Sequence, residues 1–592
     1  SIGTIDISNA LTLTGVISGS GAFVKAGAGT LELQGNNTFS GGTTLNAGIL
    51  SIGSNTALGT GTIGISGSQI RSYTTASTTL TNTVSISADT TFPNIASEKS
   101  LTFAGATTLF GATRTLTVNT GATVTTESIN FTGAIGDGGN GYGIIKTGTG
   151  TLVLSGQNTY SGNTTLNAGF TRFKYVPIGE IRFGGGTLQF DSGITTDVSS
   201  RILNNTSVIN VNTNGQNGTF ASLLSSNSGG LTKTGTGTLT LSTTPIGTNP
   251  NGIRGNIISN GGELTFTGTL STASAIYASS GAGTSGTISI SGTVIQTAGT
   301  SPRQFQIAPT AGVTGTLNVY SGGTIRNTAT GGIMLGENNG GTGIMNIYGG
   351  TVDIGGGNFY FSGPTATLSM SAGTLNTGYM FLAGGTGATS SFTINGGTAT
   401  PTLLFFGQGS GIGTLNLNGG LISTGYVSMI NLSAHVINFN GGTLRTSANG
   451  AAIGATAITN IGTGGCFYDQ SANTGSIYSV LSSQGNDGGF TKLGAGTLQL
   501  SAINVYTGTT AISAGTLRVL KKISGTGTDA SFSQANFALS TLSVTFNSNP
   551  NVGDTYKMFP TSTVNSYGSI TLVGTTGRTA TYNSSNSTLT IA

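Results

Sequence analysis

Short runs of alternating apolar and polar residues recur along the chain, and each run ends in a turn that contains glycine. In the second half, one phrase of strand, tight turn and strand occurs six times, for example at 316–325, 344–352 and 436–444. Alternation with a period of two predicts half-buried strands. The second residues of the turn pairs are 22–27 residues apart, at Gly323, Gly350, Gly373, Gly397, Gly420 and Gly442. One such unit cannot bury its own apolar face, so the repeat predicts a solenoid of stacked coils.

A third short apolar segment lies between successive phrases, at 333–335, 359–361, 379–382, 403–406 and 426–430. Three strands in 22–27 residues predict an all-β fold, a single-stranded right-handed parallel β-helix, over residues 1–522. After Lys522 the spacing changes. Strands expected at 542–546, 555–559, 570–573 and 588–592 predict an antiparallel β module over 523–592. Such a module would cap the open edge of the solenoid.

A second, longer phrase begins at a lysine and ends at a glycine 23 residues later, from Lys25 to Gly48, Lys146 to Gly169 and Lys492 to Gly515. A fourth copy runs from Lys233 to Gly262 and is six residues longer. Its insert lies in a Pro- and Asn-rich stretch at 243–252, which we expect to loop out of the coil. Insertions in repeats often form the binding face. The candidate partner-binding residues are Pro245, Asn249, Pro250 and Arg254.

The phrase Lys-x-Gly-x-Gly-Thr-Leu, followed by Asn-Thr-Tyr-Ser-Gly and Thr-Leu-Asn-Ala-Gly, resembles the autotransporter-associated β-strand repeat, also called the passenger-associated transport repeat. The resemblance covers 25–48, 146–169, 233–262 and 492–515. It implies a secreted or surface-displayed right-handed β-helix in a bacterium with an outer membrane, and it implies no catalytic site. Residues 552–559 resemble the C-terminal module of stand-alone secreted proteins with this repeat. We therefore expect the stand-alone form.

Composition excludes several classes of function. Of 592 residues, 102 are glycine and only 6% are charged, against roughly 25% in ordinary globular proteins. The net charge is +4, no basic run is longer than Lys521-Lys522 and tryptophan is absent, so nucleic acid is not an expected partner. No apolar stretch is long enough for a transmembrane helix. Cys466 is the single cysteine, which we expect to be buried; an interchain disulfide is the alternative.

Few residues could support catalysis. His435 is the single histidine, so a multi-histidine metal site is excluded and a structural role is expected. A glycosidase needs two carboxyl groups roughly 5–9.5 Å apart. The acid pairs Asp191 with Asp197 and Asp469 with Asp487 lack a nearby cluster of further charges, which favours scattered solvated acids. The glycine-rich segment 136–143 is interpreted as a loop. We predict no cofactor and no metal.

The leading hypothesis is a non-catalytic extracellular structural protein, a rigid β-helical rod that serves as a filament, stalk or surface-layer subunit. Its expected partners are copies of itself, joined end to end through the N-terminal strand at Ile2, Thr4, Ile5 and Ile7. An adhesin that binds a host or surface glycans through solenoid loops is the alternative. A polysaccharide lyase or hydrolase is the third hypothesis. In 359–361, Tyr360 is expected to face outward and could contact a sugar ring or another rod.

Overall fold

The fold is taken from a computed structural model of residues 1–592. The structure describes residues 2–521 except 74–76, 94–99, 120–127, 223, 225, 243–254, 282, 298–302, 328–330, 338–339, 409, 431–432 and 503. Beyond 521 it describes 534–536, 541–546, 555–557, 569–573, 579–583 and 588–591. The chain divides into two compact units, Ser1–Thr272 (unit 1) and Ala273–Ala592 (unit 2).

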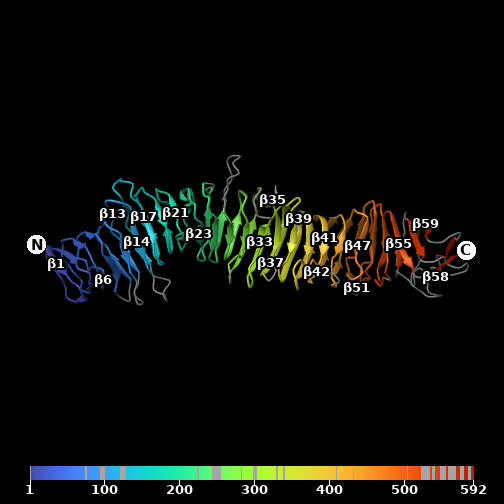
Figure 1. The fold of residues 1–592 in the computed structure, drawn as a ribbon, viewed down its shortest axis with the longest axis horizontal. Helices are drawn as coiled ribbons and strands as arrows, with labels where there is room; N and C mark the ends of the chain where they lie inside the picture. Colours follow the sequence, from blue (N-terminus) through green and yellow to red (C-terminus); the bar gives the residue numbers. More distant parts are fainter. Residues whose placement is uncertain are drawn as a thin grey trace. The chain divides into compact units, whose positions relative to one another are not determined.

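Unit 1 is a parallel β-solenoid, in which short strands of successive coils stack side by side (Figure 1). One face contains β1 (Ile2–Asp6), β3 (Ala22–Ala26), β5 (Thr43–Leu45), β7 (Ile63–Ile65), β10 (Val84–Ile86), β13 (Thr107–Leu109) and β16 (Ile135–Gly136). A second face contains β2 (Leu11–Leu13), β4 (Thr30–Leu33), β6 (Ile49–Ile52), β8 (Gln69–Ser72), β11 (Thr90–Phe92), β14 (Arg114–Val118), β17 (Ile144–Thr147), β19 (Thr164–Leu166) and β21 (Ile181–Phe183).

A third face of unit 1 starts only at β9 (Thr78–Leu80). It continues through β12 (Leu101–Phe103), β15 (Ser128–Phe131), β18 (Thr151–Leu154), β20 (Phe170–Phe173), β22 (Thr187–Gln189), β23 (Ile209–Asn212), β25 (Leu231–Thr234) and β27 (Ile257–Ser259). The strands β24 (Gly218–Phe220), β26 (Thr238–Leu241) and β28 (Gly262–Phe266) form a further parallel ladder. The first coils have two strands, fewer than the predicted average of about three, because residues 34–42 form no strand.

Unit 2 has the same parallel stacking. Its first face includes β31 (Ser285–Ile290), β34 (Thr314–Val319), β37 (Thr342–Asp353), β39 (Thr365–Leu382), β40 (Thr389–Ile394), β42 (Ile412–Leu417), β45 (Val436–Phe439), β48 (Ile458–Ile461) and β51 (Leu481–Ser483). Its second face includes β32 (Thr293–Gln296), β35 (Thr324–Asn327), β41 (Thr398–Phe406), β43 (Leu421–Thr424), β46 (Thr443–Thr446), β49 (Cys466–Gln470), β52 (Phe490–Leu493) and β54 (Thr509–Ile512).

The third face of unit 2 confirms the predicted third strands. It runs through β30 (Ile276–Ala278), β33 (Arg303–Ile307), β36 (Gly332–Leu335), β38 (Phe359–Phe361), the ends of β39 and β41, and β44 (Val427–Met429). A separate ladder then begins at β47 (Gly450–Ile453) and continues through β50 (Thr474–Ile477), β53 (Thr497–Leu500) and β55 (Thr516–Lys521). These ladders are the parallel β-helix predicted from the repeats.

The core consists of the inward-facing residue of each strand, stacked in register on the same position of the next coil. One such column is Leu317, Met345, Leu368, Phe392, Leu415 and Ile437, all at most 1% exposed. In unit 1, Phe103 and Phe131 stack with ring centroids 4.9 Å apart. Because parallel strands lie about 4.8 Å apart, identical positions in adjacent coils are always neighbours. Burial of apolar surface between coils therefore stabilises the solenoid.

The C-terminal strands differ in direction from the prediction. The strands β57 (Thr541–Phe546) and β59 (Ser569–Val573) were expected to be antiparallel, but they extend the parallel ladder of β55. Among the described strands, antiparallel pairing joins β58 (Thr555–Lys557), β60 (Ala580–Asn583) and β61 (Thr588–Ile591). Apolar alternation fixes which residues face inward, but it does not distinguish parallel from antiparallel partners. The domain boundary at 522 remains a prediction.

Among the described residues, no helix is long and apolar enough to cross a bilayer.

Candidate functional site

The lysines that open the four long repeats are buried, each on an inward-facing strand position. Lys25, Lys146, Lys233 and Lys492 are all 0% exposed and lie on β3, β17, β25 and β52. A lysine side chain is among the residues least often buried completely, because its ammonium group loses its hydration. Each of these four must therefore have polar partners inside the coil.

Backbone carbonyl groups form a cage around each ammonium group. Lys146 Nζ donates to the carbonyl oxygens of Thr147 at 2.8 Å, Gly148 at 2.8 Å and Ala168 at 3.1 Å. The first two acceptors are the two residues after the lysine, at the end of β17 and in the turn that follows it, and the third lies in the next coil. Lys25 and Lys492 make the same three contacts in their own repeats. The cage therefore joins two successive coils, and it is complete only when both are folded.

Lys233 has a modified cage. Its Nζ donates to Gly235 at 2.7 Å, to Gly237, and to Gly261 in the next coil at 2.5 Å. The insert in this repeat, within 243–252, lies outside the described residues. The bond to the next coil is retained in spite of the insert.

Glycines of the repeat permit the close approach of these carbonyl groups. Gly148 and Gly169 have φ of +73° and +63°, a backbone conformation that other L-residues rarely adopt. A Cβ atom on Gly169 would lie 2.5 Å from the carbonyl oxygens of both Gly148 and Gly150. Gly48 and Gly515, the equivalent residues, also have positive φ and equally close backbone neighbours. The fixed spacing from lysine to glycine in the sequence thus places each glycine in the coil that follows its lysine, next to the cage around the ammonium group.

Burial shifts the acidity of these lysines. Loss of hydration lowers the pKa of Lys146, Lys233 and Lys492 from 10.5 to about 8, and it also lowers the pKa of Lys25. Carboxylates oppose the shift at three positions: Asp6 for Lys25, Glu263 for Lys233 and Asp469 for Lys492.

The lysine cages predict an unusual pH dependence of stability. Between pH about 8 and 10 a folded lysine has lost its proton while an unfolded lysine keeps it, so the free energy of unfolding rises with pH. Above pH about 10 the trend reverses, because burial raises the pKa of Tyr160 to about 12 whereas an unfolded tyrosine ionises near 10.0. Urea unfolding followed by circular dichroism should therefore give the highest midpoint near pH 10. A midpoint that falls steadily from pH 8 to 10 would contradict this.

The Asn-Thr-Tyr part of the repeat forms no strand, and side-chain hydrogen bonds attach it to the neighbouring coil instead. Asn158 Oδ1 accepts from the amide of Ile135 at 2.9 Å. The hydroxyl groups of Tyr160 and Thr164 lie 2.7 Å apart, and both side chains are fully buried. The repeat at 492–515 has the same arrangement: Asn504 accepts from the Leu481 amide, and Tyr506 contacts Thr510. A segment without strand geometry is thus held in register with the coil before it.

Two aspartates, whose structural role the sequence pattern did not reveal, hold the turns beside these tyrosines. Asp137 is 2% exposed and accepts from the amides of Gly139, Gly141 and Tyr142, and from the hydroxyl of Ser161. Asp487 similarly accepts from the amides of Thr507, Gly508 and Gly489. Burial opposes ionisation, but these hydrogen bonds lower the pKa of both carboxyl groups. For Asp137, a carboxylate two to five residues before several turn amides was the available sequence signal.

The other candidate acids are engaged separately. Asp191 forms an ion pair with Arg172, and Asp197 accepts from the amides of Ser199 and Ala221.

Asp469 forms an ion pair with Arg445 at 2.7 Å. Asp487, the other member of this candidate pair, is held by the turn amides described above. No group of three or more metal-ligating side chains occurs in the part of the chain that the structure describes.

His435 and Cys466 are core residues. His435 is 0% exposed, its Nδ1 accepts from the Gly413 amide at 3.2 Å, and its ring packs on Phe406 at 5.5 Å. Burial lowers the pKa of His435, which keeps it neutral. Cys466 is 1% exposed, and burial raises the pKa of its thiol. A buried, protonated thiol is poorly placed for an interchain disulfide.

The predicted partner-binding residues Pro245, Asn249, Pro250 and Arg254 lie outside the described residues. The predicted self-association strand is β1, which pairs in parallel with β3 and is the first strand of its sheet. Thr4 is exposed there, while Ile5 and Ile7 are partly buried; the side chain of Ile2 is not described.

Comparison with known proteins agrees with the repeat structure. The family model of the passenger-associated-transport-repeat matches residues 23–52, 144–171, 231–249 and 490–519. Adhesin BmaC autotransporter of Brucella suis biovar 1 (strain 1330) is 33% identical over 174 residues, which cover 28% of this chain and 4% of that protein. The chain thus spans a small fraction of the length of this relative. No solved structure matches the chain.

Each matched segment contains one caged lysine, and three of them contain the glycine that closes the cage. The chain therefore carries the passenger-associated-transport-repeat in four coils of its β-solenoid.

Proposed function

We propose that the chain is a non-catalytic part of an extracellular surface protein and that it adheres to a partner through the side of the solenoid. The repeats and the autotransporter adhesin relative support a location outside the cell. The observation that favours adhesion over catalysis is that the buried and turn-holding ionisable side chains have structural roles. The caged lysines, Asp137, Asp487 and His435 are all engaged in holding coils together.

The first face of unit 2 offers the surface for contact. We define the hydroxyl–amide face as two registered columns of outward residues on β31, β34, β37, β39, β40 and β42. The columns are Thr287, Thr316, Ile344, Thr367, Ser391, Thr414 and Asn318, Asn346, Ser369, Thr393, Asn416; Ser289, the register partner of Asn318, is covered and only 1% exposed. None of these side chains is charged.

Amide side chains on this face are ordered by hydrogen bonds between coils. Asn346 Nδ2 donates to Asn318 Oδ1 at 2.9 Å, and Asn416 Nδ2 donates to Thr393 Oγ1 at 3.0 Å. Such ladders fix the side chains before any partner arrives, which lowers the entropy cost of binding. Hydroxyl groups both donate and accept, and they are less costly to dehydrate than charges. This supports a broad, uncharged contact surface.

Lysine substitution of three threonines on this face tests the proposal. Beads coated with the Thr316→Lys, Thr367→Lys, Thr414→Lys protein should adhere to epithelial cells at least about tenfold less than wild-type beads, because three charges must then be dehydrated. Flow-chamber counts of retained beads provide the measurement.

The matched control carries lysine at Thr44, Thr108 and Thr165, the outward middle residues of three short strands of unit 1. Its adhesion should equal that of the wild type. Equal loss in both variants would indicate a general charge effect, and retention in both would refute the hydroxyl–amide face as the adhesive surface.

A second candidate function is self-assembly through β1. Its support is the position of β1 as the first strand of a parallel sheet, since strand edges template further strands. Deleting residues 1–10 should then abolish end-to-end filaments in electron micrographs of the purified chain. Filaments of unchanged length after the deletion would exclude this role for β1.

A further inference from the structure

Aromatic side chains form an outward ladder on the third face of unit 2. Tyr360 stacks on Phe381 with ring centroids 5.2 Å apart and planes 4° apart, and Phe381 stacks on Phe405 at 5.0 Å and 11°. The three residues occupy the same register position in successive coils. The prediction that Tyr360 faces outward agrees with its partial exposure. Tyr379, 43% exposed, meets Phe381 and Phe405 edge-on.

The ladder ends at Ser428. This residue is the register partner of Phe405, so a small hydroxyl side chain follows a ring in the column. Tyr426, two residues earlier, meets Phe405 edge-on at 6.3 Å and 86°. The loss of a ring at this position leaves space beside Tyr426.

Strand pairing on this face is also interrupted here. β44 pairs with β41 on one side, whereas the following strand β47 belongs to another ladder and pairs with β50. Gly454 lies where a Cβ would come within 3.0 Å of Met429 Cγ. The missing ring and the interrupted pairing thus coincide between the same two coils.

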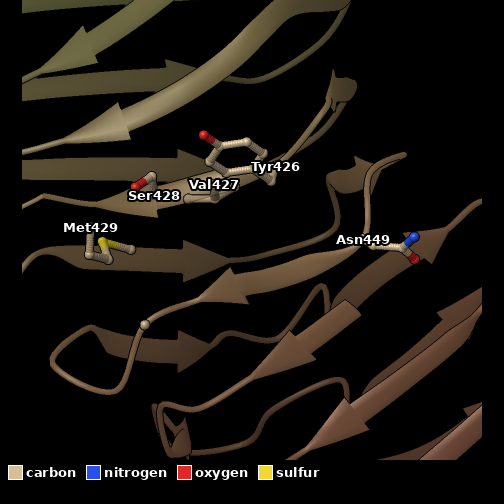
Figure 2. Close-up of a pocket in the computed structure, with 6 residues that line it drawn as sticks. Tyr426, Val427, Ser428, Met429 and Asn449 are labelled. Carbon is tan, nitrogen blue, oxygen red and sulfur yellow. The ribbon is translucent and has the colours of Figure 1, made fainter. Parts of the chain in front are cut away.

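A pocket of about 350 Å³ occupies this position. Figure 2 shows Tyr426, Ser428 and Met429 from the β44 segment, with Asn449 placed on the chain segment that leads into the next coil. The volume is at the lower end of the range of about 300–1,000 Å³ typical of small-ligand sites. Its lining combines an aromatic ring and a thioether with the hydroxyl of Ser428 and the amide of Asn449, and it contains no charged side chain.

We propose that this pocket binds a neutral saccharide. The aliphatic face of a sugar ring can pack on Tyr426, as amphipathic aromatic residues favour. Sugar hydroxyl groups can bond to the hydroxyl of Ser428 and to the Nδ2 group of Asn449, whose Oδ1 already accepts from the Thr474 amide at 3.0 Å. A charged sugar would lose hydration without finding an opposite charge in the lining, so the neutral class is favoured. The site lies on another face than the hydroxyl–amide face and does not depend on it.

Filling the pocket provides a specific test. Ser428→Phe should extend the ladder of Tyr360, Phe381 and Phe405 by one ring and occupy the space of the ligand. The whole chain would be titrated by isothermal calorimetry with maltohexaose, cellohexaose and chitohexaose as neutral probes and with sialyllactose as the acidic probe. At least one neutral probe should bind, and Ser428→Phe should weaken it at least about tenfold.

Two further variants separate the site from effects on folding. Tyr426→Ala should weaken the same probe without filling the pocket. Tyr348→Ala, which removes an exposed ring stacked on Tyr320 at 5.1 Å elsewhere in unit 2, should leave binding unchanged. Circular dichroism of each variant would verify that the coils remain folded.

The possible outcomes are distinct. Absence of binding by every neutral probe, preference for sialyllactose, or equal affinity in Ser428→Phe would each overturn the saccharide site. If beads coated with Ser428→Phe still adhere, adhesion depends on the hydroxyl–amide face and not on the pocket. Saccharide binding by a protein whose beads do not adhere would instead support the pocket and contradict the adhesive function.

Discussion

Replacing Gly169 by alanine is expected to destabilise its coil by about 4 kcal/mol. A positive φ costs an L-residue roughly 1–2 kcal/mol. In addition, the new Cβ would lie 2.5 Å from the carbonyl oxygens of Gly148 and Gly150, and those oxygens belong to backbone that cannot move without disturbing the lysine cage. Hydrogen exchange of amides in β17 and β19 should accelerate by roughly a thousandfold, because local opening limits their exchange.

Gly139→Ala is the matched control for this substitution. Gly139 also has a positive φ, +82°, but a Cβ atom added there would have no neighbour within 4 Å. Only the conformational cost of roughly 1–2 kcal/mol should remain. Equal effects of the two substitutions would show that backbone conformation alone, and not the cage, makes glycine necessary at 169.

Replacing Lys146 by methionine is expected to destabilise the same coil by about 3 kcal/mol. Methionine can fill the space of the aliphatic stem, but three buried carbonyl groups lose their ammonium donor, and an unsatisfied buried polar group costs roughly 1–3 kcal/mol. Release of the buried charge offsets part of this cost. The measurement is again hydrogen exchange in β17 and β19.

The pH dependence distinguishes a cage effect from a general packing effect. The gain in stability between pH about 8 and 10 should become smaller in Lys146→Met, because one titrating lysine has been removed. Lys174→Met is the control, since Lys174 is exposed beside Tyr175. It should change neither the stability nor its pH dependence. An unchanged pH profile in Lys146→Met would refute the assignment of that profile to the caged lysines.

The strands of the solenoid could be predicted from the sequence because period-two alternation and regular turns are local properties. The third strands at 359–361 and 403–406 were predicted correctly for this reason. The strands at 541–546 and 569–573 were found, but their direction was wrong. Direction depends on which strands become neighbours in space, and the order of residues within one strand does not reveal it.

The chemistry of the repeats was less accessible from the sequence. A lysine next to Gly-x-Gly resembles a solvated surface residue, and a single Asp137 in a glycine-rich loop resembles a polar turn residue. Their burial follows from the position of the next coil, which supplies the Ala168 carbonyl to Lys146 and the Ser161 hydroxyl to Asp137. The pocket beside Tyr426 was also not predicted, because it arises between coils from an interrupted ladder.

The sequence of a single repeat determines the coil length, the inward-facing residues and the turn glycines. They recur every 20–30 residues and follow from side-chain periodicity and from the backbone freedom of glycine. Three other features emerge only when coils stack. Carbonyl groups enclose the ammonium group of each long repeat, and the carboxylates of Asp137 and Asp487 each hold a turn of the neighbouring coil. One coil junction remains open beside Ser428. Each of these features joins residues of two coils. They arise from the close spacing of stacked backbones, which a single repeat does not contain.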